Sequence, residues 1–278
     1  MSGGTSAVLG RMIRWQATAR LWRQPLVMDF VSGTKLVGKT GMTSVSAEYY
    51  SGLFEFRVAG FMLHALAPGE RLVDVGANVG VFAVMGAGVA DADVIACEPS
   101  PAALAALAAN IGINNLGNRV EVHKAAIGDA PGILYARLDG AAVNEMRTDA
   151  ASGYGEVPVM RLDDIVADRP VSFLKIDVVG FEHHVLRGAP RLLANPALKA
   201  VALGCLRRTV GFGSSPEATL QEMTSHGFTP VQYDPVTRKL ERLSPIPYDV
   251  KVLFVRNFDA MAETVRQAPR FSVNGRWY

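Results

Sequence analysis

Several acidic residues of this sequence follow apolar segments, at positions where they could bind a ligand or take part in a reaction. Asp74 lies near the end of one apolar segment, and Gly76, Asn78 and Gly80 follow it at two-residue intervals. Glycines let a ligand approach the backbone closely. Glu98 follows the next apolar segment. We therefore expect a ligand site where a glycine turn meets two carboxylates.

The glycine turn does not match the pattern that binds dinucleotides. A G-x-G-x-x-G motif starting at Gly76 would need glycines where Asn78 and Val81 stand. The carboxylate of Asp74 would also repel a diphosphate, but it suits a ligand with an ammonium and a sulfonium group. S-adenosylmethionine carries both, and one charge-assisted contact is worth about 1–3 kcal/mol. A nicotinamide-dependent oxidoreductase is therefore disfavoured.

The second acid is placed to receive the ribose of such a ligand. Glu98 precedes Pro99 and Ser100 and would accept both ribose hydroxyls. Taken alone, it is equally an acid at a helix N-terminus. Ala126 and Asp129 would border the adenine, although Asp129 can also be read as a turn residue.

Alternating strand and helix patterns begin at residue 71. We predict strands at 71–75, 93–97, 120–123, 172–176, 200–203 and 250–255, and helices at 53–66, 79–89 and 101–113 and from near residues 182 and 216. A β segment with turns is expected within 28–45. This alternation predicts a doubly wound α/β fold with a mostly parallel sheet covered on both faces.

The N-terminal segment has a different character. Residues 7–22 read as a basic amphipathic helix, which would pack on the main domain or form a homodimer contact. The alternative is a helix for a membrane surface or a partner. We expect three parts: an extension over 1–50, a ligand-binding domain over 51–256 and a C-terminal tail over 257–278.

The composition of the chain bears on its core, its partners and its cellular compartment. Hydrophobic residues make up 49% of the chain and charged residues 19%, which is enough for a large core, and the net charge of +2 predicts no nucleic-acid partner. No apolar run reaches the roughly 20 residues that cross a bilayer, so we expect no integral membrane segment. Cys97 and Cys205 lie in apolar runs and favour free thiols in a reducing cytoplasm.

The chain resembles the FkbM family of S-adenosylmethionine-dependent methyltransferases over roughly residues 50–256. The resemblance is carried by GERLVDVGANVGVF (69–82), CEPSPAALAALAAN (97–110), RLDDIVADRPVSFLKIDVVGFEHHVLR (161–187), and HGFTPVQYDPVTRKL (226–240) with VLFVR after it. It implies a seven-strand sheet with the last strand antiparallel. It also implies methyl transfer to a hydroxyl of a sugar, polyketide or other small metabolite. The implied cofactor contacts are Asp74, Gly76, Asn78, Gly80 and Glu98, with Glu55 either a further contact or a solvated helix acid.

Two positions depart from the family pattern on the side of the methyl acceptor. The segment at Asp177 resembles K-I-D-x-E-G-x-E, but Val179 replaces the middle acid, and Gly204 stands where a similar strand ends in Glu. The acceptor or the base then differs, or activity is weak. A cofactor-binding scaffold or sensor without catalysis is the alternative. With two acids missing, we predict no metal site.

A base assists methyl transfer when the acceptor is a hydroxyl. The candidates are Asp177, Glu182 and His183, with His184 beside them. Adjacent histidines on a helix cannot face the same way, so at most one can point into the site. Asp177 is the first choice, and its alternative role is to cap the helix that begins near Glu182.

Overall fold

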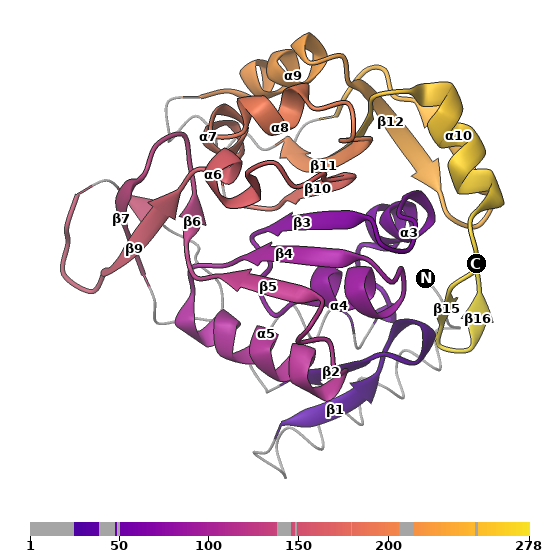
Figure 1. Cartoon of the computed structure of the whole chain (residues 1–278), viewed down its shortest axis with the longest axis horizontal. Helices are drawn as coiled ribbons and strands as arrows, with labels where there is room; N and C mark the ends of the chain where they lie inside the picture. The colour runs from indigo at the N-terminus through magenta and orange to yellow at the C-terminus, as the bar shows by residue number, and fades with distance from the viewer. Residues whose placement is uncertain are drawn as a thin grey trace.

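The structure is a computed structural model that describes residues 25–38, 48, 51–137, 146–147, 149–178, 180–205, 214–247 and 250–278. The helix predicted over residues 7–22 and the position of Val179 lie outside the described residues. Figure 1 shows a central sheet with helices on both sides and a smaller sheet projecting from one end.

The central sheet is mostly parallel, as the strand pattern predicts. In spatial order its strands are β13 (Lys239–Arg242), β12 (Thr229–Asp234), β14 (Val250–Val255), β11 (Ala200–Cys205), β10 (Phe173–Ile176), β3 (Arg71–Val75), β4 (Asp93–Cys97) and β5 (Val120–His123). The five strands from β11 to β5 are parallel, and β14 is antiparallel to both of its neighbours. The doubly wound α/β fold is confirmed. In the described part of the chain, β13 adds an eighth strand to the seven that were expected.

Helices cover the two faces of this sheet. One face carries α3 (Phe56–Ala65), α4 (Val81–Gly88), α5 (Pro101–Ile113) and α10 (Phe258–Gln267), and the other carries α6 (Leu162–Val166), α7 (Glu182–Arg187), α8 (Pro190–Ala194) and α9 (Pro216–Ser225). Successive strand residues alternate between the faces. Leu72 and Phe173 therefore pack under α3 and α4, whereas Val73 and Leu174 pack under α6 and α7.

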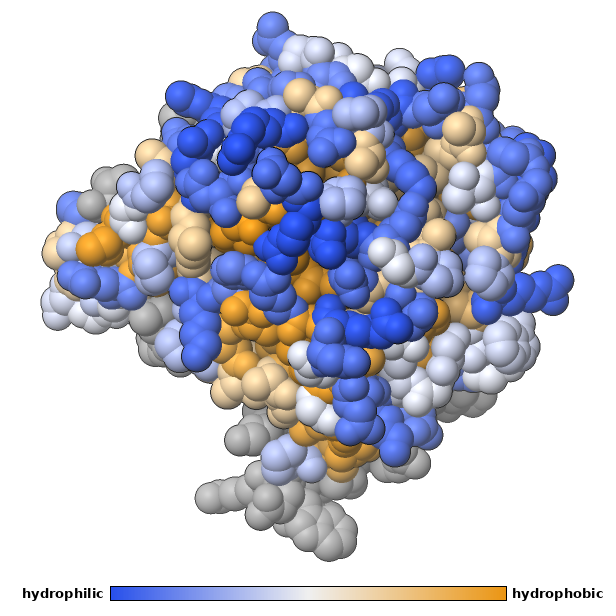
Figure 2. Space-filling model, in the orientation of Figure 1, coloured by the Kyte–Doolittle hydropathy of each residue, from blue (hydrophilic) through white to orange (hydrophobic). Residues whose placement is uncertain are grey.

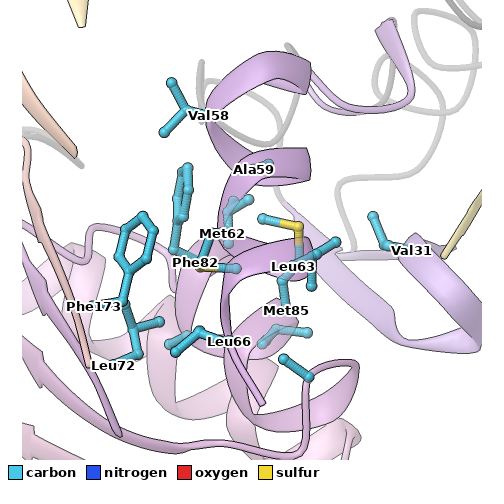
Figure 3. Close-up of a cluster of buried hydrophobic side chains, with 14 of the residues drawn as sticks. Val31, Val58, Ala59, Met62, Leu63, Leu66, Leu72, Phe82, Met85 and Phe173 are labelled. Atoms are coloured by element: carbon cyan, nitrogen blue, oxygen red, sulfur yellow. The ribbon is translucent and has the colours of Figure 1, made fainter. Parts of the chain in front are cut away.

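The core between α3, α4 and the sheet is closely packed. Figure 3 shows Met62 of α3 near Phe82 and Met85 of α4, with Leu72 and Phe173 of the sheet beside them. Each such side chain stabilises the fold by about 1.5–3 kcal/mol when it leaves water. This packing fixes the start of α4, and with it the glycine turn, against the end of β3.

Both ends of the described chain join the same core. β1 (Leu26–Asp29) and β2 (Lys35–Gly38) form an antiparallel hairpin through the 3₁₀ turn η1 (Val31–Gly33). At the other end, β15 (Ser272–Val273) and β16 (Arg276–Trp277) form a hairpin below α10 (Figure 1). The division into 1–50, 51–256 and 257–278 stays a prediction.

The smaller sheet was not predicted from the sequence. It consists of β6 (Ala126–Ile127), β9 (Gly155–Met160), β7 (Gly132–Ala136) and β8 (Met146–Arg147), in that order. Figure 2 shows hydrophobic residues at the surface over this sheet, and Ile133 of β7 is exposed. Its strands are short and their apolar alternation is weak, so the sequence pattern does not predict them.

Two predicted helices are shorter than expected. The helix predicted over 79–89 begins at Val81, because Asn78 and Gly80 have φ values of 51° and 90°, which no α-helix accommodates. The helix predicted over 53–66 begins at Phe56, after Glu55 as its N-cap. Among the described residues, no helix combines the length and the apolar character needed to span a bilayer.

Candidate functional site

The glycine turn lies where β3 ends and α4 begins. Gly76 has a φ of 76°, and a Cβ there would come within 2.2 Å of the carbonyl oxygen of Asp177. Its N–H donates to the carbonyl of Cys97 at 2.9 Å. Only glycine fits this position, so the turn is held between the ends of β10 and β4.

A buried ion pair lies beneath the turn. The ammonium of Lys175 on β10 donates to Oδ1 of Asp74 at 2.7 Å and to the carbonyl of Gly76 at 3.1 Å. Burial disfavours the charged amine, but the carboxylates of Asp74 and Asp177 outweigh it and hold the pKa of Lys175 above its usual range. Oδ1 of Asp74 is therefore bound to Lys175, whereas Oδ2 takes no part in this pair.

Glu98 braces the turn from the next strand. One carboxylate oxygen accepts the N–H of Asn78 and the other accepts the N–H of Ser100, each at 2.8 Å. Burial raises the pKa of Glu98 and these two donors work against that rise. In this structure the carboxylate orders the loop around the turn.

A cavity of about 340 Å³ opens beside the turn. Its lining comes from the end of β10, from the turn and start of α4, and from the segment before α3. The lining residues are Glu48, Phe54, Glu55, Gly76, Ala77, Asn78, Val79, Val81, Phe82, Lys175 and Asp177. Phe54 is 65% exposed, so it presents an aromatic ring to any ligand in the cavity.

Lys251 of β14 links two carboxylates of the cavity. Its ammonium contacts Asp177 at 2.6 Å and also pairs with Glu55. Burial raises the pKa of Asp177, but the charges of Lys175 and Lys251 outweigh burial and bring that pKa below its usual range. Asp177 is consequently an ionised group and a weak base.

Two other carboxyls, unlike Asp177, have raised pKa values. Burial raises the pKa of Glu48 to about 7, although its carboxylate accepts the N–H of Phe54 at 2.8 Å. Burial likewise raises the pKa of Glu182 to about 7. Both groups change charge near neutral pH, which is the range in which a general base works best.

Several buried oxygens around the turn lack a hydrogen-bond partner within the described residues. They are Oδ2 of Asp74, Oδ1 of Asn78 and Oε2 of Glu55. Buried polar atoms are nearly always hydrogen-bonded in folded proteins. Three such acceptors from three segments of the chain indicate that this region is built to receive hydrogen-bond donors from a ligand.

The predicted site residues divide into two groups. Glu55, Gly76, Asn78 and Asp177 line the cavity, and Asp74 lies directly beneath it through its pair with Lys175. The other predicted cofactor contacts, Gly80 among them, lie outside the cavity lining. Gly80 ends the turn with a Cβ position 2.4 Å from a methyl carbon of Leu107.

The remaining predicted cofactor residues lie farther along the sheet edge. Pro99 follows Glu98, and Ser100 caps α5 by accepting the N–H of Ala103. Ala126 is buried in β6 and packs in the small sheet. Asp129 pairs with His184 at 3.3 Å. None of these four belongs to the lining of the cavity.

The predicted histidine and Glu182 lie outside the cavity lining. Glu182 is fully buried at the start of α7. His183 bonds Ser214 at 2.6 Å, whereas the ring of His184 stacks on Phe181. The two histidines thus face different ways. Among the described residues, no group of three His, Cys, Asp or Glu side chains could hold a metal ion.

Among the residues that sequence reasoning missed are Glu48, Phe54 and Lys175 of the cavity lining, and Lys251, which contacts two lining carboxylates. Glu48 and Phe54 precede the recognisable strand pattern, and Lys251 lies in the last strand, far along the chain from the motifs. Lys175 belongs to the segment that resembles the family, so its charge in an apolar strand could have identified it. A lysine buried in a strand is rare unless it is paired.

The chain is similar in sequence to known proteins. A model of the Methyltransferase FkbM domain matches residues 74–230, which is more than half of the chain. A relative from Streptomyces tacrolimicus, described as 31-O-demethyl-FK506 methyltransferase FkbM, is 30% identical over 162 residues, or 44% of this chain and 60% of the relative. The chain therefore spans less than two thirds of that relative.

Two solved structures are similar in arrangement. Methyltransferase FkbM from Methylobacillus flagellatus KT has a TM-score of 0.47 and 17% identity, covering 90% of this chain and 60% of that one. A structure described as a putative transferase from Pyrococcus horikoshii has a TM-score of 0.47 and 14% identity. The match covers 84% of this chain and 72% of that one. The assignment rests on the sequence match, which begins at Asp74 and includes Glu98 and Asp177. The chain belongs to the FkbM family of methyltransferases.

Proposed function

We propose that this protein transfers a methyl group from S-adenosylmethionine to a hydroxyl of a small metabolite. The observation that carries the proposal is the set of unpartnered acceptor oxygens around one cavity, on Glu55, Asp74 and Asn78. Acceptors suit a ligand that brings an ammonium and hydroxyls. The printed name of the Streptomyces tacrolimicus relative includes an O-demethyl acceptor, which supports a hydroxyl as the methylated group.

The residues present fit S-adenosylmethionine. Glu55 and Asp74 each offer a carboxylate oxygen to its ammonium, and Gly76 lets it lie against the backbone of the turn. Asn78, whose Oδ1 is free within the described residues, and Glu98, which accepts the N–H of Asn78, would hold the ribose hydroxyls. When bound, the cofactor supplies an activated methyl group on sulfur.

The chain then has to orient the acceptor and remove its proton. Holding donor and acceptor in line can supply about 7–11 kcal/mol of the barrier. Asp177, the first predicted base, is held as a carboxylate by two lysines, so it would orient the hydroxyl rather than take the proton. Glu48 lines the same cavity with a pKa of about 7, and we propose it as the base.

Binding and turnover test the proposal separately. Calorimetry should show binding of S-adenosylmethionine and of S-adenosylhomocysteine, and little binding of NAD. Incubation with a panel of hydroxylated metabolites should then give products heavier by one methyl group, detected by mass spectrometry. Tighter binding of NAD than of either sulfur nucleoside would refute the cofactor, and binding without any methylated product would favour a scaffold or sensor.

Variants test the roles of the two carboxyls. Glu48→Gln should lower kcat by about 10²–10⁴ and leave the Kd for S-adenosylmethionine nearly unchanged, because it removes a general base. Asp177→Asn should raise KM for the acceptor more than it lowers kcat. A wild-type kcat for Glu48→Gln would exclude Glu48 as the base.

A further inference from the structure

Three residues form a row across three strands at the edge of the cavity. Gly204 on β11 pairs with Lys251 on β14. On the other side of β11, Ile176 pairs with Leu203, so the next position in register is Asp177 beside Gly204. Asp177, Gly204 and Lys251 thus lie side by side, with the glycine in the middle.

All three positions belong to the same face of the sheet. Phe173, Ala202 and Leu253, which lie an even number of residues away along their strands, pack in the core under α3 and α4. Neighbouring strands lie about 4.8 Å apart, so Lys251 and Asp177 are separated by about 10 Å of backbone. The ammonium of Lys251 nevertheless reaches Asp177 at 2.6 Å. Its side chain crosses β11 over Gly204, where no side chain stands in the way.

The same ammonium connects the sheet to the segment that closes the cavity. It pairs with Glu55, which is the N-cap of α3, as well as with Asp177 after β10. Oε2 of Glu55 stays buried without a partner in the described residues. Lys251 therefore binds one oxygen of Glu55 and leaves the other for a ligand.

The charged groups at and beside the cavity come from several elements of the described structure. They are Glu48 and Glu55 before α3, Asp74 on β3, Lys175 on β10, Asp177 after β10 and Glu182 on α7. Lys175 is occupied by Asp74, and its ammonium lies 3.8 Å from Asp177. Within this described set, Lys251 is the cation that faces Glu48, Glu55, Asp177 and Glu182 together.

We propose that Lys251, extended across Gly204, is a positioning residue that orients the carboxylates of Glu55 and Asp177 and brings a positive charge to the acids at the cavity. This inference deepens the proposed function and rests on it for the acceptor. Gly204 then has a definite task, which is to leave a path for the lysine side chain. A side chain at 204 on this face would occupy that path.

The first test needs no ligand. In protein labelled with ¹³C at Asp and Glu carboxyls, NMR titration of Lys251→Met should move the midpoint of Asp177 up by about one pH unit, as expected when an opposite charge is lost. The midpoints of Glu48 and Glu182 should also rise, because Lys251 lowers the pKa of each. Lys251→Arg should restore the wild-type midpoints.

A matched lysine serves as the control. Lys199 also pairs with a carboxylate, Glu70, but in the loop before β11 and outside the cavity lining. Lys199→Met should leave all three midpoints unchanged. Unchanged midpoints in Lys251→Met would overturn the proposal, since Lys251 would then be a structural ion pair only.

Substitution of Gly204 gives an independent test of the path of the Lys251 side chain. Gly204→Leu with Lys251 intact should reproduce the titration shifts of Lys251→Met, and Gly204→Ala should give smaller shifts in the same direction. Should Gly204→Leu not fold, the graded comparison of Gly204→Ala with wild type decides. Wild-type midpoints in a folded Gly204→Leu protein would show that the lysine does not need this path.

Activity completes the test. The acidic limb of the pH profile of kcat/KM should move to higher pH in Lys251→Met and return in Lys251→Arg. A merely structural lysine would lower activity at every pH and leave the limb in place. If wild-type protein binds neither sulfur nucleoside, the proposed function fails, whereas the carboxyl titrations still decide the role of Lys251.

Discussion

The ion pair of Lys175 and Asp74 joins a proposed cofactor contact to the core. Asp74 is fully buried and Lys175 nearly so, and the two share a bond of 2.7 Å. Removing one partner of a buried pair leaves an uncompensated charge, which costs more than the pair itself contributes. The carboxylate that we propose as a cofactor contact is thus also part of the core.

Asp74→Ala should therefore lower the free energy of unfolding by about 3–5 kcal/mol, because it strands the Lys175 ammonium. Urea denaturation at pH 7 measures this. The double variant Asp74→Ala with Lys175→Met should recover a large part of the loss. If Asp74→Ala and the double variant are equally stable, the Lys175 ammonium in Asp74→Ala reaches solvent and is not left buried without a partner.

Glu48 and Glu182 predict a pH dependence of stability. A carboxyl whose pKa rises from 4.5 in the unfolded chain to about 7 in the folded one binds more protons when folded. Stability then falls as pH rises between these values, by about 3 kcal/mol for each group. Urea midpoints should thus be lower at pH 8 than at pH 5. Glu48→Gln should make the fall less steep, whereas Glu156→Gln, at an exposed carboxyl of β9, should leave the wild-type slope.

At the scale of elements, the glycine turn and the end of β10 depend on each other. Gly69 and Gly76 have nearly the same φ, 78° and 76°, but a Cβ at Gly69 meets nothing within 4 Å. Alanine should cost about 1–2 kcal/mol of backbone strain at either position. Only Gly76→Ala should also push the turn away from Asp177, and calorimetry should show weaker binding of S-adenosylmethionine for that variant alone. Equal affinities in the two variants would contradict this coupling.

The C-terminal helix and hairpin act as part of the core. Phe271 is 2% exposed and its ring lies near those of Phe56, His64 and Tyr278. Phe271→Ala should lower the free energy of unfolding by about 3–5 kcal/mol. Trp277→Ala, at a side chain that is 62% exposed, should change it by less than about 0.5 kcal/mol. Thermal and urea unfolding compare the two, and a small effect at Phe271 would show that the hairpin is dispensable for stability.

At the scale of the whole molecule, two lysines pair with carboxylates at the cavity. Lys175 pairs with Asp74, and the ammonium of Lys251 joins Glu55 and Asp177. A hard cation needs several oxygen ligands, and an ammonium among them repels it. The two carboxylates that Lys251 joins are thus poorly suited to hold a divalent cation.

Methyl transfer should therefore proceed without a divalent metal. EDTA should leave the rate unchanged, and added magnesium should not raise it. The Lys251→Met variant is the sharp comparison, because it alone frees the two carboxylates. Loss of wild-type activity in EDTA, with recovery on adding magnesium, would overturn this prediction.

The sequence by itself determined the fold class and predicted the glycine turn at the edge of the cavity. Strand and helix periods are local properties, and an acid, a glycine turn and a helix occur within ten residues of Asp74, so their arrangement follows from spacing alone. The same reasoning predicted β14, whereas the family came from the resemblance of whole sequence stretches. It did not predict the small sheet, whose β6 and β8 are two residues long.

Only the tertiary structure decided which distant side chains meet at the cavity. Glu48, Asp177 and Lys251 are separated by long stretches of chain, and strand order and register bring them to one cavity. Register is not local, because it depends on which strand lies beside which and on the pairing between them. Gly204 is an example: in the sequence it is a missing acid, and in the sheet it is the gap over which Lys251 reaches Asp177.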